Sequence, residues 1–448
     1  MRRLIAVVAG LALVSGAVGC DSNKKDEEKG AEAEAEKADE EKTSEFEAGE
    51  GVDLENKTIH IGALNDESGP ADSIGKPFAV GKRLIAKRVN EEGDLLPKGW
   101  TVELHEEDHQ YNPSKAVQSY KKIKDDVLFI ATSFGTPNTL PLRKFLEKDN
   151  IVAFPASLSS KMAEHEYTPP VAPSYKLEAM RAMDWAVDDA GGTDKVKAGI
   201  VYQKDDYGKD GLEGWKQAAT EHGVEIVAEQ TVSAGQKDVT AVVKGLKDAG
   251  ANYVMLSLLP SSSGPILGTA GQLDYTPKWI GNTPAWIDKF FAEKGPLPAE
   301  AFANFHWATG LPYWGEDVPG MKEFEETYET YGKDQYSRDF YILTSYIQGL
   351  AQVEILRRAL EEEKLTREAF VEQMHGIKSW DGGGIIQEID FSEVPYVTGD
   401  EVRILKPAME EKSWTVAGDY AVPKAFEQDA GGGEKPDESG DSAKEAAE

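Results

Sequence analysis

Short apolar runs alternate with amphipathic stretches along most of the chain. Residues 128–131 and 151–154 are apolar runs that are too brief for helices and rich in β-forming residues, as buried parallel strands usually are. Residues 138–147, between them, fit one crossover helix. Further strands are predicted at 57–64 and 101–106, and further helices at 76–89 and from Pro113. This alternation predicts a parallel sheet with right-handed crossovers.

The same alternation restarts after a proline-rich interruption at residues 168–173. Strands are predicted at 198–202, 225–228, 253–256, 279–280 and 303–309, and helices at 176–189, 209–222, 321–331, 340–362 and 366–374. Residues 383–416 alternate like antiparallel edge strands. The fold class is therefore predicted as α/β, with two doubly wound parallel-sheet lobes joined by a multi-strand hinge.

We expect lobe 1 to comprise residues 56–173 and about 303–365, and lobe 2 to comprise residues 174–302 and about 366–422. The segments 21–55 and 423–448 are rich in Glu, Lys and Ala, so we predict a disordered acidic tether and a disordered acidic tail. The whole chain has a net charge of -31, which excludes a nucleic-acid-binding surface.

Residues 1–20 have the pattern of a cleaved export signal. Two arginines precede an apolar stretch at 4–14, which is too short to span a membrane as a mature helix. The following Ala17-Val18-Gly19-Cys20 resembles the bacterial lipoprotein box, which implies that Cys20 becomes the first mature residue and carries a lipid anchor. Asp21 implies, for some Gram-negative envelopes, retention at the inner membrane. An ordinary signal with an incidental cysteine is the alternative.

Residues 105–109 match the metalloprotease pattern HExxH. Zinc binding by that motif needs a helix, on which residues four apart lie on one face. Here the segment continues a strand, where four residues span roughly 13 Å. A zinc hydrolase acting through His105 and His109 is therefore a minor alternative, and Cys20, the single cysteine, excludes a cysteine-based zinc site. We expect no enzyme activity, no catalytic residue, no cofactor and no metal.

The loops that follow the predicted strands carry the candidate ligand-binding residues. The carboxyl ends of parallel strands meet at the sheet edge where ligands bind, and these loops offer hydroxyls, small residues and aromatic rings. Turn formation alone is the plain alternative. The candidates are Ser68, Phe134, Gly135, Thr136, Ala156 and Ser157 in lobe 1 and Tyr207, Gln236, Asn282 and Trp286 in lobe 2.

Six segments in register, between about residues 57 and 416, resemble the extracytoplasmic solute-binding proteins of the branched-chain amino-acid (Leu/Ile/Val) ABC-transporter family, which have the type I periplasmic-binding fold. The segments are 61–63 with 68–70, 107–116, 133–136, 154–157, 206–208 and 234–238. By this resemblance, a ligand carboxylate would lie near Gly135, Thr136, Ala156 and Ser157, and an ammonium near Tyr207 and Gln236.

Two departures from the family pattern bear on the ligand. Gln236 stands where amino-acid binders of this family often have an acidic residue, and Leu158 stands where a hydroxyl residue is common. An amide, a carboxylate or a differently shaped amino acid is therefore an alternative to leucine or valine.

The resemblance implies a monomeric lipoprotein at the cell envelope, facing the periplasm or the exterior and anchored to the membrane through Cys20. It would capture a small polar solute, an amino acid or a related amide or carboxylate, and deliver it to an ABC permease with separate ATPase subunits. A ligand-sensing receptor of the same fold is the alternative. No nucleic-acid partner is expected.

Overall fold

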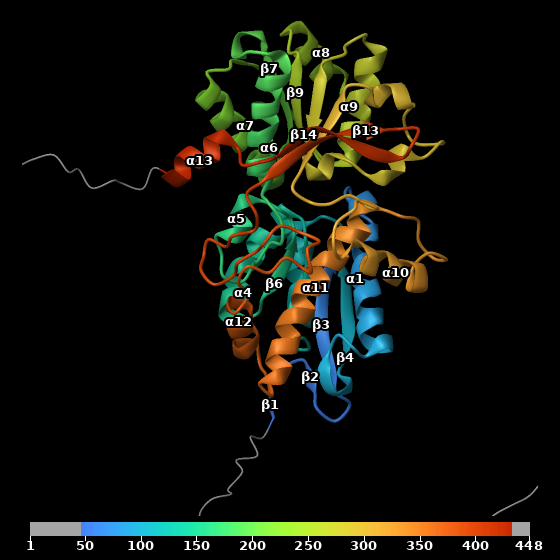
Figure 1. Ribbon diagram of the computed structural model, residues 1–448, viewed down its shortest axis with the longest axis vertical. Coiled ribbons are helices and arrows are strands. Elements are labelled where there is room, and N and C mark those ends of the chain that lie inside the picture. Colours follow the sequence, from blue (N-terminus) through green and yellow to red (C-terminus); the bar gives the residue numbers. More distant parts are fainter. Residues whose placement is uncertain (1–45, 432–448) are drawn as a thin grey trace, which may run out of the picture. The chain divides into compact units, whose positions relative to one another are not determined.

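Two large β-sheets and one small two-stranded sheet organise residues 46–431, the part of the chain that the computed structural model describes (Figure 1). The predicted signal peptide, Cys20 and most of the two acidic segments lie outside the described residues. No described helix has both the length and the hydrophobicity of a membrane span. The two-sheet α/β architecture confirms the predicted fold class.

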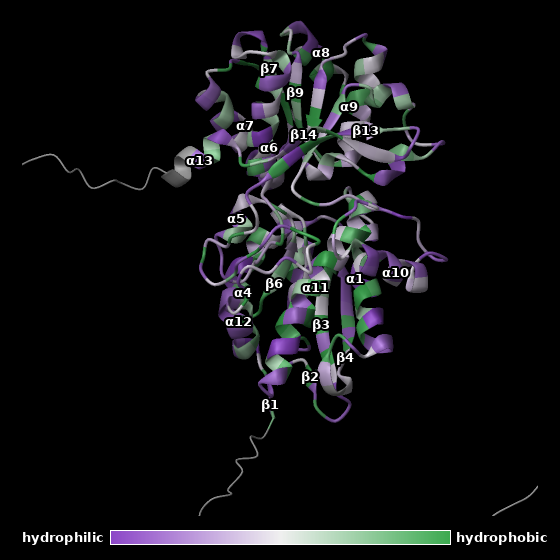
Figure 2. Cartoon of the chain, in the orientation of Figure 1, coloured by the Kyte–Doolittle hydropathy of each residue, from purple (hydrophilic) through white to green (hydrophobic). Residues whose placement is uncertain are grey.

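The first sheet has the order β2-β3-β5-β6, with β4 paired to β3. The strands are β2 (Val52–Asp53), β3 (Thr58–Asn65), β4 (Thr101–Asp108), β5 (Ile130–Phe134) and β6 (Ala153–Ala156). All but β2 run parallel. Its helices are α1 (Asp72–Glu92), α2 (Pro113–Ile123), α5 (Ser160–Ala163), α10 (Met321–Tyr331), α11 (Phe340–Glu361) and α12 (Arg367–His375). Figure 2 shows hydrophobic and hydrophilic residues interleaved along α1, as expected for a helix with one buried face.

The second sheet has the order β14-β13-β11-β10-β9-β7-β8. Its strands are β7 (Ala198–Gln203), β8 (Ile226–Val232), β9 (Tyr253–Ser257), β10 (Lys278–Gly281), β11 (Phe305–Thr309), β13 (Val402–Ala408) and β14 (Ser413–Ala421). The first five run parallel, and β13 and β14 complete the edge as antiparallel strands. Its helices are α6 (Tyr175–Ala190), α7 (Asp206–His222), α8 (Thr240–Asp248), α9 (Pro260–Gln272) and α13 (Lys424–Gly431).

Side chains that cap helix ends set several of these boundaries. The Asn112 side chain accepts hydrogen bonds from the backbone of Ser114 and Lys115, and Pro113 occupies the first helical position of α2. Asp205 caps α7 in the same way by accepting from the N–H of Gly208. This cap fixes where the chain turns from β7 into α7, next to the gap between the lobes.

The helix predicted at 138–147 is broken into three pieces. They are α3 (Thr136–Thr139), a 3₁₀ turn η2 (Leu140–Leu142) and α4 (Arg143–Asp149). Pro141 lies in the middle turn, and proline can neither donate a backbone hydrogen bond nor fit easily inside a helix. The first piece, α3, is thereby separate from α4 and belongs to the strand-end loop of β5.

The chain crosses between the lobes three times, at about residues 164–174, 310–320 and 398–401. These crossings differ from the predicted domain boundaries. β11 pairs with β10 and so belongs to lobe 2, whereas residues from about 303 were expected in lobe 1. Helix α12 was expected in lobe 2 but packs on lobe 1, because Phe370 stacks on Phe129 with ring centroids 4.3 Å apart.

The predicted disorder of residues 21–55 is wrong for residues 46–55. Phe46 stacks on Trp100 at 5.4 Å, and β1 (Glu47–Ala48) pairs with β12 (Lys364–Leu365). At the other end, α13 replaces the start of the predicted disordered tail, and Ala425 is buried in the cluster that includes residues of α6 and α7. Few apolar residues are present in either segment, but Phe46 and Ala425 contact partners that are far away in the sequence.

Candidate functional site

A cavity lies between the two lobes, at the carboxyl ends of strands from both sheets. Its volume is about 50 Å³. The lining residues are Ile74, Phe78, Tyr111, Phe134, Gly135, Thr136, Pro155, Ala156, Ser157, Leu158, Val171, Tyr175, Tyr207, Leu259, Thr283, Pro284, Tyr341, Thr344 and Gln348.

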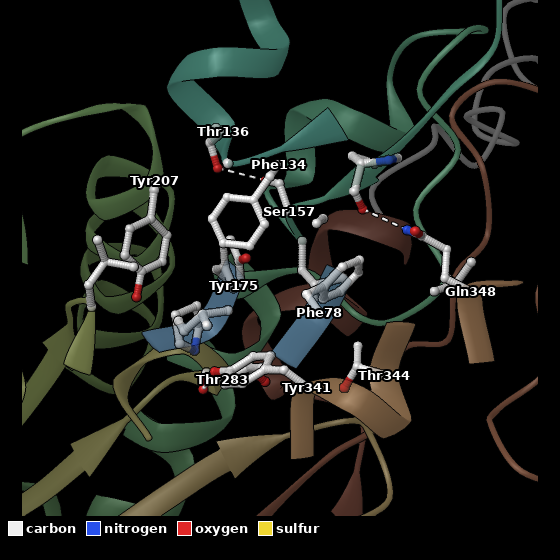
Figure 3. Close-up of a pocket in the computed structure, with 18 of the residues that line it drawn as sticks. Phe78, Phe134, Thr136, Ser157, Tyr175, Tyr207, Thr283, Tyr341, Thr344 and Gln348 are labelled. Carbon is white, nitrogen blue, oxygen red and sulfur yellow. Dashed lines mark hydrogen bonds between the residues drawn. The ribbon is translucent and has the colours of Figure 1, made fainter. Parts of the chain in front are cut away.

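Two hydroxyls from neighbouring strand ends meet on the lobe 1 side of this cavity. Thr136 Oγ1 and Ser157 Oγ lie 2.6 Å apart and are joined by a hydrogen bond (Figure 3). The preceding Gly135 has φ +86°, and a Cβ at this position would lie 2.8 Å from the ring of Tyr111. Glycine is therefore required where the loop approaches the tyrosine, and it allows the two hydroxyls to reach the cavity edge.

Six aromatic residues line the cavity. Figure 3 shows Phe78, Phe134, Tyr175, Tyr207 and Tyr341 around the space, contributed by both lobes. Phe78 packs edge-on against Phe134 with centroids 6.2 Å apart, and Tyr175 packs edge-on against Tyr207 at 5.0 Å. Such contacts fix the rings, so the wall presents a shaped apolar surface.

The hydroxyls of two of these tyrosines are already hydrogen-bonded to the protein. Tyr207 Oη donates to Asn282 Oδ1 at 2.8 Å. Tyr341 Oη lies 2.9 Å from the carbonyl oxygen of Thr283 and 3.1 Å from that of Trp286. These bonds hold the phenol groups on lobe 2, and the rings are left to contact a solute.

The cavity lining carries no formal charge. Among its lining residues, all of them in the described part of the chain, none is Asp, Glu, Lys or Arg. Glu178 lies directly behind the wall, where it accepts hydrogen bonds from the backbone N–H (2.9 Å) and the hydroxyl of Thr283. Burial raises the pKa of Glu178 to about 8, so this carboxyl is mostly uncharged at neutral pH.

Gln348 connects the wall to a buried lysine. Its Nε2 donates to the carbonyl oxygen of Pro155 at 2.9 Å, and its Oε1 accepts from Lys82 Nζ at 3.3 Å. Complete burial lowers the pKa of Lys82 well below its ordinary value. The lysine thus orients the amide that holds the end of β6, and it does not itself line the cavity.

The structure brings together six of the ten predicted ligand-binding residues. Those that line the cavity are Phe134, Gly135, Thr136, Ala156, Ser157 and Tyr207. Asn282 is buried one layer behind, as the hydrogen-bond partner of Tyr207. Leu158, noted as a departure from the family pattern, also lines the cavity.

The other three predicted residues lie outside the lining. The Gln236 side chain bonds within its own loop, accepting from the N–H of Ser233 and donating to the carbonyl oxygen of Asp238. Ser68 donates to Asp108. Trp286 is fully buried in an aromatic cluster with Phe290, Phe291, Phe302, Phe305 and Trp414. It was expected at the cavity but is part of the lobe 2 core.

Several lining residues were not predicted from the sequence. Tyr175 follows the first crossing between the lobes, and Tyr341 and Gln348 lie on α11; Gln348 bonds to Pro155, 193 residues earlier in the chain. Strand ends predict only the loops and helix starts that directly follow them, and α11 follows another helix, α10. The one local signal was the cap residue Asp339, which marks the start of α11 immediately before Tyr341.

The HExxH segment lies on β4 and at its end, as its continuation of a predicted strand led us to expect. His109 is fully buried, and its Nδ1 accepts from the N–H of Tyr111 at 3.1 Å. Burial lowers the pKa of His109 to about 4. The motif therefore has no helical face on which His105 and His109 could share a zinc ion.

Comparison with known proteins shows what the chain is similar to. A family model described as "periplasmic binding protein" matches residues 58–394. An amino acid binding protein of Pseudomonas aeruginosa is 20% identical over 74% of this chain and 88% of its own length. A Leu/Ile/Val-binding protein homolog of Brucella melitensis is 25% identical over 62% of this chain and 76% of its own.

Solved structures share the fold. A fatty acid ABC transporter substrate-binding protein from Thermomonospora curvata superposes with a TM-score of 0.78 at 24% identity, over 85% of this chain and 96% of that one. A branched chain amino acid ABC transporter protein from Thermus thermophilus, with bound valine, superposes with a TM-score of 0.74 at 22% identity, over 84% and 99% of the two chains. Those two structures thus share one fold and differ in the named solute.

Proposed function

Because the chain belongs to the periplasmic binding protein family, we propose that it captures a small molecule between its lobes and delivers it to an ABC permease driven by ATPase subunits. The family match spans both sheets, and the cavity is lined from both of them. A solute that contacts both lobes stabilises the closed arrangement through those contacts. Family membership implies that the lobes work outside the cytoplasm, which fits the proposed lipid anchor at Cys20.

The proposed chemical class of the ligand rests on one observation, which is that the cavity lining is uncharged and rich in aromatic residues. A buried ammonium needs an ionised partner or a full set of acceptors, and the carboxyl behind Thr283, Glu178, is mostly protonated at neutral pH. The hydroxyls of Thr136 and Ser157 can both donate to a carboxylate that displaces their mutual bond. The proposed ligand is therefore a compact carboxylic acid with an apolar body and without an α-ammonium group.

An amino-acid zwitterion is the competing ligand, since relatives are named for amino acids. Matched pairs separate the two: 4-methylpentanoate against leucine, and 3-phenylpropanoate against phenylalanine. Within each pair, the two compounds share the apolar body and the carboxylate, and only the amino acid has an ammonium group. In one pair at least, we expect the carboxylic acid to bind at least about tenfold more tightly than the amino acid, a difference of about 1.4 kcal/mol. Thermal shift and calorimetry measure the two affinities. Tighter binding of the amino acids in both pairs would overturn the ligand class.

Two threonines of α3 provide a matched test of the site. Thr136→Val removes a cavity hydroxyl, so affinity for the bound acid should fall by about 1–3 kcal/mol. Thr139→Val removes a buried hydroxyl that bonds to Ser133 but does not line the cavity. It should lower the melting temperature and leave affinity unchanged. Equal affinity loss in both variants, or none in Thr136→Val, would show that the solute binds elsewhere.

A further inference from the structure

Two histidines and a glutamate gather on the outer part of the first sheet, apart from the cavity. His60 Nδ1 lies 3.0 Å from His105 Nε2 and 3.7 Å from Glu103 Oε2. One ligand atom from each of the three lies within 4.8 Å of both others. None of the three lines the interlobe cavity, so the cluster has no part in the proposed solute site.

The parallel register of β3 and β4 creates this cluster. His60 is the direct partner of Glu103, and Gly62 is the partner of His105. Residues two apart on a strand share a face, so Glu103 and His105 point to the same side as His60. Ile59 and Ile61 alternate with them into the hydrophobic core. The ligand set is therefore held by two paired strands and not by a loop.

The spacing of the donor atoms suits a tetrahedral metal ion. Zinc–nitrogen bonds of about 2.0–2.1 Å place two ligand atoms of a tetrahedron about 3.3 Å apart. The observed separations of 3.0 and 3.7 Å lie within a few tenths of an ångström of that value. The hydrogen bond between the rings thus holds the two nitrogens almost where a shared ion would require them.

The exposure of the cluster leaves room for a fourth ligand. The side chains of His60 and Glu103 are 27% and 62% exposed, so an ion can enter from solvent and keep a water molecule. Three protein ligands plus water form the open coordination set found at many zinc sites. The chain's net charge of -31 also raises the local concentration of cations.

From this geometry we propose that His60, Glu103 and His105 form a binding site for a divalent first-row transition metal ion such as Zn²⁺. Two imidazoles and one carboxylate suit Zn²⁺, Ni²⁺ or Cu²⁺, whereas Mg²⁺ and Ca²⁺ prefer sets made of oxygen ligands. The ion would join β4, an edge strand, to β3 and would lie on lobe 1 alone. The proposal uses His105 of the HExxH segment, but its second histidine is His60 from the neighbouring strand.

The test is a titration of the full-length chain, purified in detergent and stripped of metal, with Zn²⁺ against a chromophoric chelator. We expect one site that His60→Ala and His105→Ala each weaken by at least about tenfold. The matched control is His375→Ala, another partly exposed lobe 1 histidine near a carboxylate, Glu166 at 3.8 Å. This control variant should retain the Zn²⁺ site. The acidic segments are present in every variant, so any Zn²⁺ that they bind is the same background in all titrations.

Two further measurements keep the outcome clear. Crystals soaked in Zn²⁺ should show an anomalous peak in contact with all three side chains, a result that depends on no variant. If an alanine variant unfolds, His105→Gln keeps a hydrogen-bonding side chain and should still lose the metal. Zn²⁺ binding of equal strength in a His60→Ala/His105→Ala double variant, a peak elsewhere, or an equal thermal shift with Mg²⁺ would overturn the proposal.

Discussion

Glu178 is a buried carboxyl that holds a proton directly behind the cavity wall. Its carboxyl is hydrogen-bonded to Thr283, a lining residue, and burial raises its pKa to about 8 from an ordinary 4.5. Between these values the folded chain binds a proton that the unfolded chain has released. The contribution of this group to stability is therefore present at acid pH and is lost as the pH rises through about 8.

Glu178→Gln should remove this pH dependence. We expect the free energy of unfolding of the wild type to fall between pH 5 and pH 8 by on the order of 2–4 kcal/mol relative to the variant, since a tenfold change in proton affinity corresponds to about 1.4 kcal/mol. Urea unfolding at several pH values measures it. Glu213→Gln, an exposed substitution on α7, is the control and should follow the wild type. Parallel curves for wild type and Glu178→Gln would contradict the prediction.

Single residues show which parts of the site the sequence can reveal. Gly135, Thr136 and Ser157 were predicted because they directly follow apolar strands, and parallel strands share an edge. Tyr341 was missed because its place depends on α11 returning to the first sheet, which no local pattern records. Gln236 follows a strand as well, but its side-chain amide forms hydrogen bonds within its own loop. Strand ends can be predicted; the direction of a side chain beyond them cannot.

At the scale of elements, the N-terminal segment shows where composition misleads. Residues 46–55 are acidic and poor in apolar residues, yet β1 and β2 pair with strands of lobe 1. A single aromatic residue, Phe46, packs against Trp100. Composition averages over a segment, whereas one well-placed ring and a few backbone hydrogen bonds suffice to order it. Most other elements were predicted, the helices from apolar residues at helical spacing and the strands from short apolar runs.

Phe46→Ala should destabilise the protein by about 1–2 kcal/mol, because it removes a stacked aromatic pair and part of the cover over Trp100. The midpoint of urea unfolding measures this. Leu54→Ala, in the same segment but 46% exposed, should leave the midpoint almost unchanged. Identical midpoints for wild type and Phe46→Ala would mean that the segment is the disordered tether that its composition suggests.

At the scale of the whole molecule, two carboxyls from opposite lobes face each other beside a groove of about 980 Å³. Asp288 of lobe 2 accepts from the N–H of Phe340 in lobe 1 at 2.8 Å, and Asp339 caps the same helix end. Burial raises the pKa of both, and Asp288 raises that of Asp339 further by charge repulsion. The arrangement of the lobes in which Asp288 and Asp339 are buried together therefore favours a proton on this pair.

A solute that holds the lobes in this arrangement should bind more weakly as the pH rises from 5 to 8, by at most about tenfold per pH unit for one proton. Asp288→Asn removes one of the two charges and should flatten this dependence. Calorimetry in buffers of different ionisation enthalpy would detect proton uptake on binding in the wild type only. Asp248→Asn, on the exposed end of α8, should behave as the wild type. Proton uptake that persists in Asp288→Asn would disprove the coupling.

The ends of the described chain belong to different lobes: β1 pairs with β12 on lobe 1, and α13 packs on α6 and α7 of lobe 2 (Figure 1). Dyes attached at Glu47 and Glu427, both on the surface, would each report on a separate lobe. Energy transfer between them would change whenever the lobes part or approach. The chain thereby offers attachment points for an optical sensor of its own solute, and neither point touches the cavity.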